Sequence, residues 1–238
     1  MSRQRTNRLH DGRISTCSFM LCLAVSISLA PALARADEFS QITNHSIRLV
    51  RGTVVVDARV GDILIEGWDK ERVDVEAEKV VRADSDKDSK QMFDRIRLAI
   101  GTDEEERTVF LKTLYPPRRP WRPFRGESKL TINLRMKIPR DANLILKCVD
   151  GDVRVRGIKG NEQLKVNYGS VEISVPSVWD LKSVQAHTWL GYVENNLQPL
   201  PESDSGISRR VIFWNPQGRQ EITINVHMGG VFVYGDYN

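Results

Sequence analysis

The chain has 238 residues, a formal net charge of +4 and a sequence pI near 9.0. The basic excess is confined to the first 36 residues, which hold five arginines and one aspartate, so the remainder balances 30 basic residues against 30 acidic ones. This balance excludes a global attraction to nucleic acid or to anionic membranes as the basis of function, and we expect no nucleic-acid partner. Only Cys148 remains after residue 36, so no intramolecular disulfide is expected.

The first 36 residues have the layout of a secretory signal. A basic leader precedes an apolar run over residues 19–33, and Ala34-Arg35-Ala36 offers the small-x-small pattern that a signal peptidase reads. The run is too short and too interrupted for a membrane span, which needs about 20 mostly apolar residues. We therefore expect a signal peptide over residues 1–36, a single β-repeat domain over residues 37–238 with no integral membrane span, and export to the periplasm or cell surface.

After residue 36 the dominant pattern is alternation of apolar and polar residues with period two, which is typical of strands. Residues 129–138 are a clear case, because Leu130, Ile132, Leu134, Met136 and Ile138 share one face. The one helix predicted covers residues 85–94, with Asp84 or Ser85 as its N-cap. The chain is therefore predicted to be all-β with one short helix.

The alternation contains a repeat centred on glycine. Residues 53–68 align without a gap on residues 143–158, and apolar residues change phase at the central glycine. Four alternating positions before the glycine and two or three after it are predicted to face one core, so the chain must bulge or turn a corner at the glycine. The repeat occurs five times, around Gly61, Gly151, Gly169, Gly191 and Gly229.

The three central glycines lie 18 and 22 residues apart, a spacing that suits one coil of a β-solenoid. We therefore predict a β-solenoid-like stack in which each unit buries its apolar face against its neighbours, with a β-sandwich of bulged strands as the alternative. Insertions at residues 79–128 and 198–218 interrupt the stack. Both are expected to form surface excursions, and the first carries the helix and two strands.

Residues 134–175 contain three short motifs. They are Ile138-Pro139 at a predicted strand end, Gly151-Asp152-Val153, and the similar Gly169-Ser170-Val171. Through them residues 134–175 resemble a bacterial family of unknown function with adhesin-like β-strand repeats. Gly61-Asp62-Ile63 and Gly229-Gly230-Val231 fit the same pattern and extend the resemblance to most of residues 45–238. The resemblance implies an exported or envelope-facing β-repeat protein without assigned catalysis. It supplies no functional residues.

A basic aromatic loop over residues 115–125 is the predicted binding site. Its guanidinium groups suit carboxylates or phosphates, its aromatic faces suit sugar rings, and its prolines favour an extended backbone. The alternative is that the rings cap one edge of the stack while the arginines stay solvated. The candidate residues are Tyr115, Arg118, Arg119, Trp121, Arg122, Phe124 and Arg125.

A second class of function rests on Asp150 and Asp152. Asp150 stands in the fourth predicted inward position of its repeat, and two carboxylates on one surface could cleave a glycan by acid–base chemistry. An aspartate before glycine is also an ordinary turn residue that accepts hydrogen bonds from nearby amides. We assign no catalytic residues and keep a glycan-active β-solenoid enzyme as the alternative.

No metal or cofactor is expected. Asp84, Asp86 and Asp88 start like a calcium-binding loop, but the pattern fails at the sixth and twelfth positions, which are Ser89 and Arg95. The three histidines after the leader, His45, His187 and His227, lie far apart in sequence and lack zinc-site spacing. Cys148 shares its repeat position with Ala58 and is predicted to be a small core residue.

These observations predict an exported, non-enzymatic envelope protein with an adhesin-like or scaffolding role. The expected partner is an anionic glycan or other cell-envelope polymer, or another envelope protein.

Overall fold

The computed structural model describes residues 37–83, 85–116, 130–197, 202–203 and 209–237. The described residues belong to one compact unit. Strands dominate it, so the all-β prediction is confirmed. The strands are β1 (Asp37–Arg48), β2 (Thr53–Val60), β3 (Ile63–Trp68), β4 (Arg72–Ala83), β5 (Arg97–Asp103), β6 (Thr108–Leu114), β7 (Leu130–Pro139), β8 (Asn143–Asp150), β9 (Val153–Arg156), β10 (Glu162–Tyr168), β11 (Val171–Val175), β12 (Leu181–Leu190), β13 (Val193–Asn195), β14 (Glu202–Ser203), β15 (Arg209–Trp214), β16 (Gln220–Met228) and β17 (Val231–Gly235).

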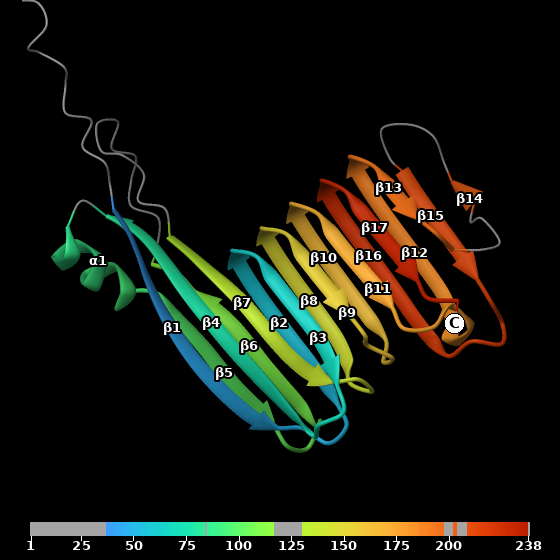
Figure 1. The fold of residues 1–238 in the computed structure, drawn as a ribbon, viewed down its shortest axis with the longest axis horizontal. Helices are drawn as coiled ribbons and strands as arrows, with labels where there is room; N and C mark the ends of the chain where they lie inside the picture. The colour runs from blue at the N-terminus through green and yellow to red at the C-terminus, as the bar shows by residue number, and fades with distance from the viewer. Residues whose placement is uncertain (1–36, 84, 117–129, 198–201, 204–208, 238) are drawn as a thin grey trace, which may run out of the picture. The chain divides into compact units, whose positions relative to one another are not determined.

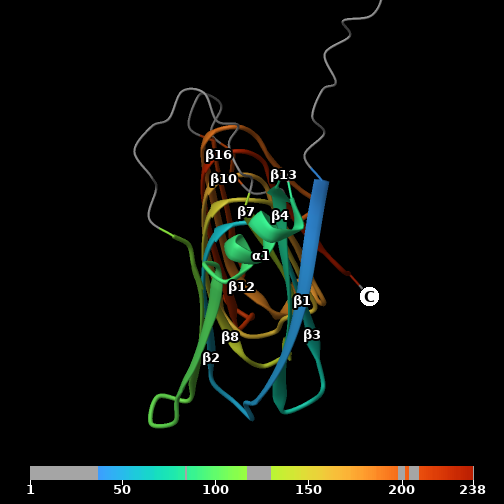
Figure 2. The same ribbon diagram turned by 90° about the vertical axis from the view of Figure 1, so that its left-hand side faces the viewer.

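The strands form two mixed sheets that face each other (Figures 1 and 2). Sheet A has the order β1-β4-β7-β3-β9-β11-β17-β13, and sheet B has the order β14-β15-β12-β16-β10-β8-β2-β6-β5. Each glycine-centred repeat gives its first strand to sheet B and its second strand to sheet A. Within each sheet the repeat strands pair in parallel.

The core lies between the two sheets. Residues that alternate toward it, such as Leu146 on β8 and Val153 on β9, are fully buried and belong to one hydrophobic cluster. Because the chain passes from one sheet to the other at each glycine, the change of phase keeps both halves of a repeat facing this core. The predicted corner is therefore confirmed.

The corner glycines stack on one another. Gly151 has a φ of 147°, and a Cβ added to it would collide with the carbonyl oxygen of Gly61. Gly169, with a φ of 126°, meets the carbonyl oxygen of Gly151 in the same way. Both the backbone conformation and the close approach of the next turn require glycine at these two positions.

The repeats do not stack in chain order. Strand β16 of the fifth repeat lies between β10 of the third and β12 of the fourth, and β17 lies between β11 and β13 (Figure 1). The cause is strand β15, in the insertion at residues 198–218. It pairs antiparallel with the edge of β12 that faces away from β10, so the next strand, β16, pairs with the other edge of β12. This segment was expected to be a surface excursion. The expectation was wrong for β15, whose Val211 and Phe213 are buried in the core.

The other insertion carries the predicted helix, α1 (Asp86–Phe93), whose N-cap Ser85 accepts a hydrogen bond from the amide of Asp88. Its strands β5 and β6 form a hairpin, and β6 extends sheet B beside β2. Strand β1 was not predicted. It lies at the edge of sheet A and most of its residues are exposed, so its sequence is mostly polar and lacks the alternation of apolar residues that marks the other strands. Among the described residues, no helix is long and apolar enough to cross a membrane.

Candidate functional site

Tyr115 is the one predicted binding residue that the structure describes. Its hydroxyl donates a 2.6 Å hydrogen bond to the carbonyl of Val60, and its ring packs against the core. Burial raises the pKa of this hydroxyl to about 12. Tyr115 therefore anchors the start of the loop. The other six candidates, from Arg118 to Arg125, lie outside the described residues, and binding by this loop stays a prediction.

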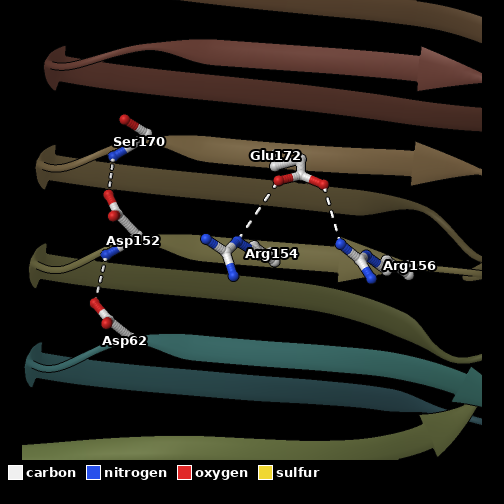
Figure 3. Close-up of polar contacts among 6 residues, drawn as sticks. All are labelled: Asp62, Asp152, Arg154, Arg156, Ser170 and Glu172. Carbon is white, nitrogen blue, oxygen red and sulfur yellow. Dashed lines mark hydrogen bonds and ion pairs between the residues drawn. The ribbon is translucent and has the colours of Figure 1, made fainter.

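Asp152 belongs to a ladder that links successive turns at the corner (Figure 3). The Asp62 carboxylate accepts a 3.1 Å hydrogen bond from the Asp152 amide, and the Asp152 carboxylate accepts a 2.8 Å bond from the Ser170 amide. This structural role explains the aspartate of the Gly-Asp-Val motif without catalysis.

The fourth position of the repeat was expected to face the core, and this was wrong for Asp150. Asp150 is exposed, as are Tyr168 and Met228 in the same position of their repeats. The reason is the corner itself, since the last residue before the glycine lies at the rim of the two-sheet sandwich. Cys148, two residues earlier, is buried as predicted, and burial raises the pKa of its thiol to about 11.

The structure brings two distant histidines together. His187 lies on β12 and His227 on the adjacent β16, where the register pairs His187 with Asn225. The sequence spacing of 40 residues between them had suggested separate positions. Among the residues described, no group of three or more histidine, cysteine, aspartate or glutamate side chains could hold a metal ion.

Around these histidines the outer face of sheet B is hollowed. We call this depression, of about 520 Å³, the sheet B groove. It crosses three neighbouring strands from three different repeats, β10, β16 and β12. Its outward side chains and rim are Lys165, Asn167, Tyr168, His187, Trp189, Asn225 and His227, with Val166 and Val226 beneath them.

An aromatic pair forms one side of the groove. The indole of Trp189 stacks on the imidazole of His227, with ring centroids 5.0 Å apart and planes within 4°. Trp189 is 48% exposed and Tyr168 is 49% exposed. Exposed aromatic rings beside amide side chains give a surface that can both stack on a ligand and hydrogen bond to it.

A second depression of about 600 Å³ lies on the outer face of sheet A. Both of its arginines already have acidic partners, since Arg135 pairs with Glu76 at 3.0 Å and Arg72 pairs with Asp74 at 3.1 Å. A ligand there would have to displace these pairs. The sheet B groove is therefore the stronger candidate.

The alternation rule places His187, His227, Trp189 and Lys165 on the outer face, opposite the apolar positions of their strands. The groove was missed because it depends on which repeats are neighbours. No local pattern shows that the fifth repeat lies between the third and the fourth.

No family model matches the chain, and no curated protein matches it. Solved structures do. A "putative cell adhesion protein" from Clostridium sporogenes is similar with a TM-score of 0.51 at 8% identity, over 84% of this chain and 100% of that one. A "putative adhesin" from Bacteroides fragilis gives 0.23 at 12% identity over 82% and 97%, and a "putative lipid binding protein" from Parabacteroides distasonis gives 0.21 at 10% over the same shares.

The chain is a two-sheet β protein with an open groove on the outer face of sheet B. Its fold is similar to that of the clostridial protein, and at 8% sequence identity the similarity concerns the fold alone.

Proposed function

We propose that this chain is an exported, non-enzymatic binding protein of the cell envelope, with an adhesin-like or scaffolding role, and that it binds through the sheet B groove. The observation that carries the proposal is the exposed Trp189–His227 pair, set among amide and basic side chains on a hydrogen-bonded sheet. A site built on strands holds its side chains more precisely than a site on loops.

Three further points support this function. The fold is shared with a protein described as involved in cell adhesion. The leader predicts export. Asp152, which the enzyme alternative requires, serves as a hydrogen-bond acceptor in the corner ladder. We interpret the parallel repeats as flattened, solenoid-like coils whose last two have exchanged order, a scaffold on which neighbouring repeats present a continuous outer face.

The test is retention of the purified protein on insoluble envelope material. We expect Trp189→Ala to lower retention about tenfold, because one stacked aromatic ring often supplies much of the energy of a small binding site. Trp214→Ala is the matched control, since Trp214 lies on the outer face of the same sheet, on β15, and is 61% exposed. Equal retention of the Trp189→Ala variant and the parent would contradict the proposal.

The loop of residues 115–125 is proposed as a separate contact. Replacing Arg118, Arg119, Arg122 and Arg125 by serine tests it in the same assay. Loss of retention in this variant alone would move the binding site from the groove to the loop.

A further inference from the structure

One row of outward side chains crosses five strands of sheet B and includes three residues of the groove, Lys165, Asn225 and His187. The register joins Lys147 on β8 to Lys165 on β10, Lys165 to Asn225 on β16, Asn225 to His187 on β12, and His187 to Arg210 on β15. Neighbouring strands lie about 4.8 Å apart, so the row extends for roughly 19 Å. It runs across the strands and continues through the sheet B groove.

This row holds three cationic side chains, Lys147, Lys165 and Arg210. Among the described residues, no carboxylate forms an ion pair with Lys147, Lys165 or Arg210. Two other lysines on the same face are paired. Lys112 contacts Asp57 at 3.0 Å, beside the β8 end of the row, and Lys182 contacts Glu221 at 2.6 Å away from the row.

The chain after residue 36 is balanced in charge as a whole. Asp57 lies beside Lys147 in the register but already pairs with Lys112, so the unpaired Lys147, Lys165 and Arg210 leave a local excess of positive charge on this part of the face. An anionic partner is therefore favoured, and a linear one can contact several positions of the row at once.

The uncharged side chains in and beside the row indicate what else the partner carries. Asn225 in the row and Asn167 beside it each offer an amide that both donates and accepts hydrogen bonds, which suits hydroxyl groups. Trp189 and Tyr168 offer exposed ring surface, which suits the C–H faces of a sugar. A simple anion would use only the cations, whereas this surface combines charge, hydroxyl-binding and stacking groups.

We infer that the sheet B groove and its basic row bind an acidic polysaccharide, lying across strands β8, β10, β16, β12 and β15. This inference rests on the proposed function and names its ligand class. The acidic groups contact Lys147, Lys165 and Arg210, the sugar hydroxyls contact the two asparagines, and one sugar ring packs on Trp189.

The test measures affinity of the full protein for three uronate polymers, polygalacturonate, hyaluronan and alginate, and for each polymer after methyl esterification of its carboxylates. We expect at least one acidic polymer to bind about tenfold more tightly than its neutral ester, with affinity falling as NaCl rises from about 50 mM to about 500 mM, because salt screens exposed charges. Equal affinity for acid and ester, or no binding to any of the three acids, would overturn the inference.

Two variants locate the contact. Lys165→Gln should weaken binding to the acidic polymer about fivefold or more and reduce its salt dependence, since one exposed charge-assisted contact is lost. Lys159→Gln, an exposed lysine outside the row, is the matched control and should bind as the parent does. Equal binding by the Lys165→Gln variant and the parent would show that the acidic groups of the polymer do not contact this row, and would contradict the inference.

Oligothymidylate and phosphatidylglycerol vesicles complete the comparison. Tighter binding to either than to every acidic polysaccharide would replace the inferred ligand class. Retention on envelope material that depends on Trp189 but shows no preference for acidic polymers would overturn this inference while leaving the proposed binding function in place.

Discussion

Gln220 donates a 3.0 Å hydrogen bond from Nε2 to Oε1 of Glu162, and both side chains are buried. Glu162 is only 3% exposed, and the register places it between Leu144 and Ile222, which fill the same position of neighbouring repeats. Gln220 also donates to the carbonyls of Ile158 and Gly160, so the pair ties β16 to the turn before β10. Among the described residues, Oε2 of Glu162 has no hydrogen-bond partner.

This environment predicts a stability that depends on pH. Burial raises the pKa of Glu162 from 4.5 to about 8. Between these two values the folded chain retains a proton that the unfolded chain releases, so the free energy of unfolding falls as pH rises through this window and levels off above it. The loss should amount to a few kcal/mol, since one pKa unit corresponds to about 1.4 kcal/mol.

Urea unfolding at pH values from about 5 to about 9 measures this change. Glu162→Gln is the control, because an amide cannot ionise and its pH profile should be flatter in the same window. Parallel profiles for the variant and the parent would show that Glu162 is not the group responsible.

The stacked corner predicts an unequal response of two glycines to alanine. In Gly169→Ala, the added Cβ meets the carbonyl oxygen of Gly151, and the positive φ is also strained, so the free energy of unfolding should fall by about 2 kcal/mol or more. In Gly101→Ala, on β5, a Cβ meets nothing within 4 Å, and the change should stay small. Thermal unfolding compares the two. A similar loss in both variants would argue against the close approach of turns at the corner.

The aspartate ladder predicts that Asp152 stabilises the fold. Asp152→Ala leaves the Ser170 amide without its acceptor and should cost about 1 kcal/mol, whereas Asp152→Asn keeps an oxygen and should cost less. Asp150→Ala removes an exposed side chain and should change stability little. The same variants test the enzyme alternative. A glycan-cleaving activity of the parent that disappears in both Asp150→Ala and Asp152→Asn would support catalysis over a structural role.

The alternation of the core predicts a further contrast between adjacent residues on β9. Val153 is fully buried, so Val153→Asp places an unpaired charge in the core and should unfold the protein. Arg154 is exposed and lies 3.5 Å from the Glu172 carboxylate, so Arg154→Asp should cost little. Equal melting temperatures for these two variants would contradict the inward and outward assignments.

Local features of the fold could be predicted from the sequence because they depend on local periodicity. Alternation identified the buried faces around Leu146 and Val153, and the phase change at Gly151 identified the corner. Three features could not be predicted in this way. The order of the last two repeats depends on the pairing of β15 with β12, the exposure of Asp150 depends on where the two sheets end, and Glu162 is a polar residue in an apolar row.

The candidate site was harder to predict for the same reason. Trp189 and His227 come from different repeats and meet because β12 and β16 are neighbours in sheet B. The basic loop of residues 115–125 could be predicted as a binding site because its charged and aromatic residues are contiguous in sequence. The structure shows that a comparable combination arises on the sheet by assembly of three repeats.

The most direct test of binding at the groove follows the indole N–H signals of the five tryptophans by NMR, with tryptophan labelled by ¹⁵N and each signal assigned by substitution. Solubilised envelope polysaccharide is then titrated into the protein. Binding at the groove predicts that the Trp189 signal shifts or broadens, while the signals of Trp68 and Trp214 stay in place. An unmoved Trp189 signal together with a shifted Trp121 signal would contradict the account and assign binding to the loop.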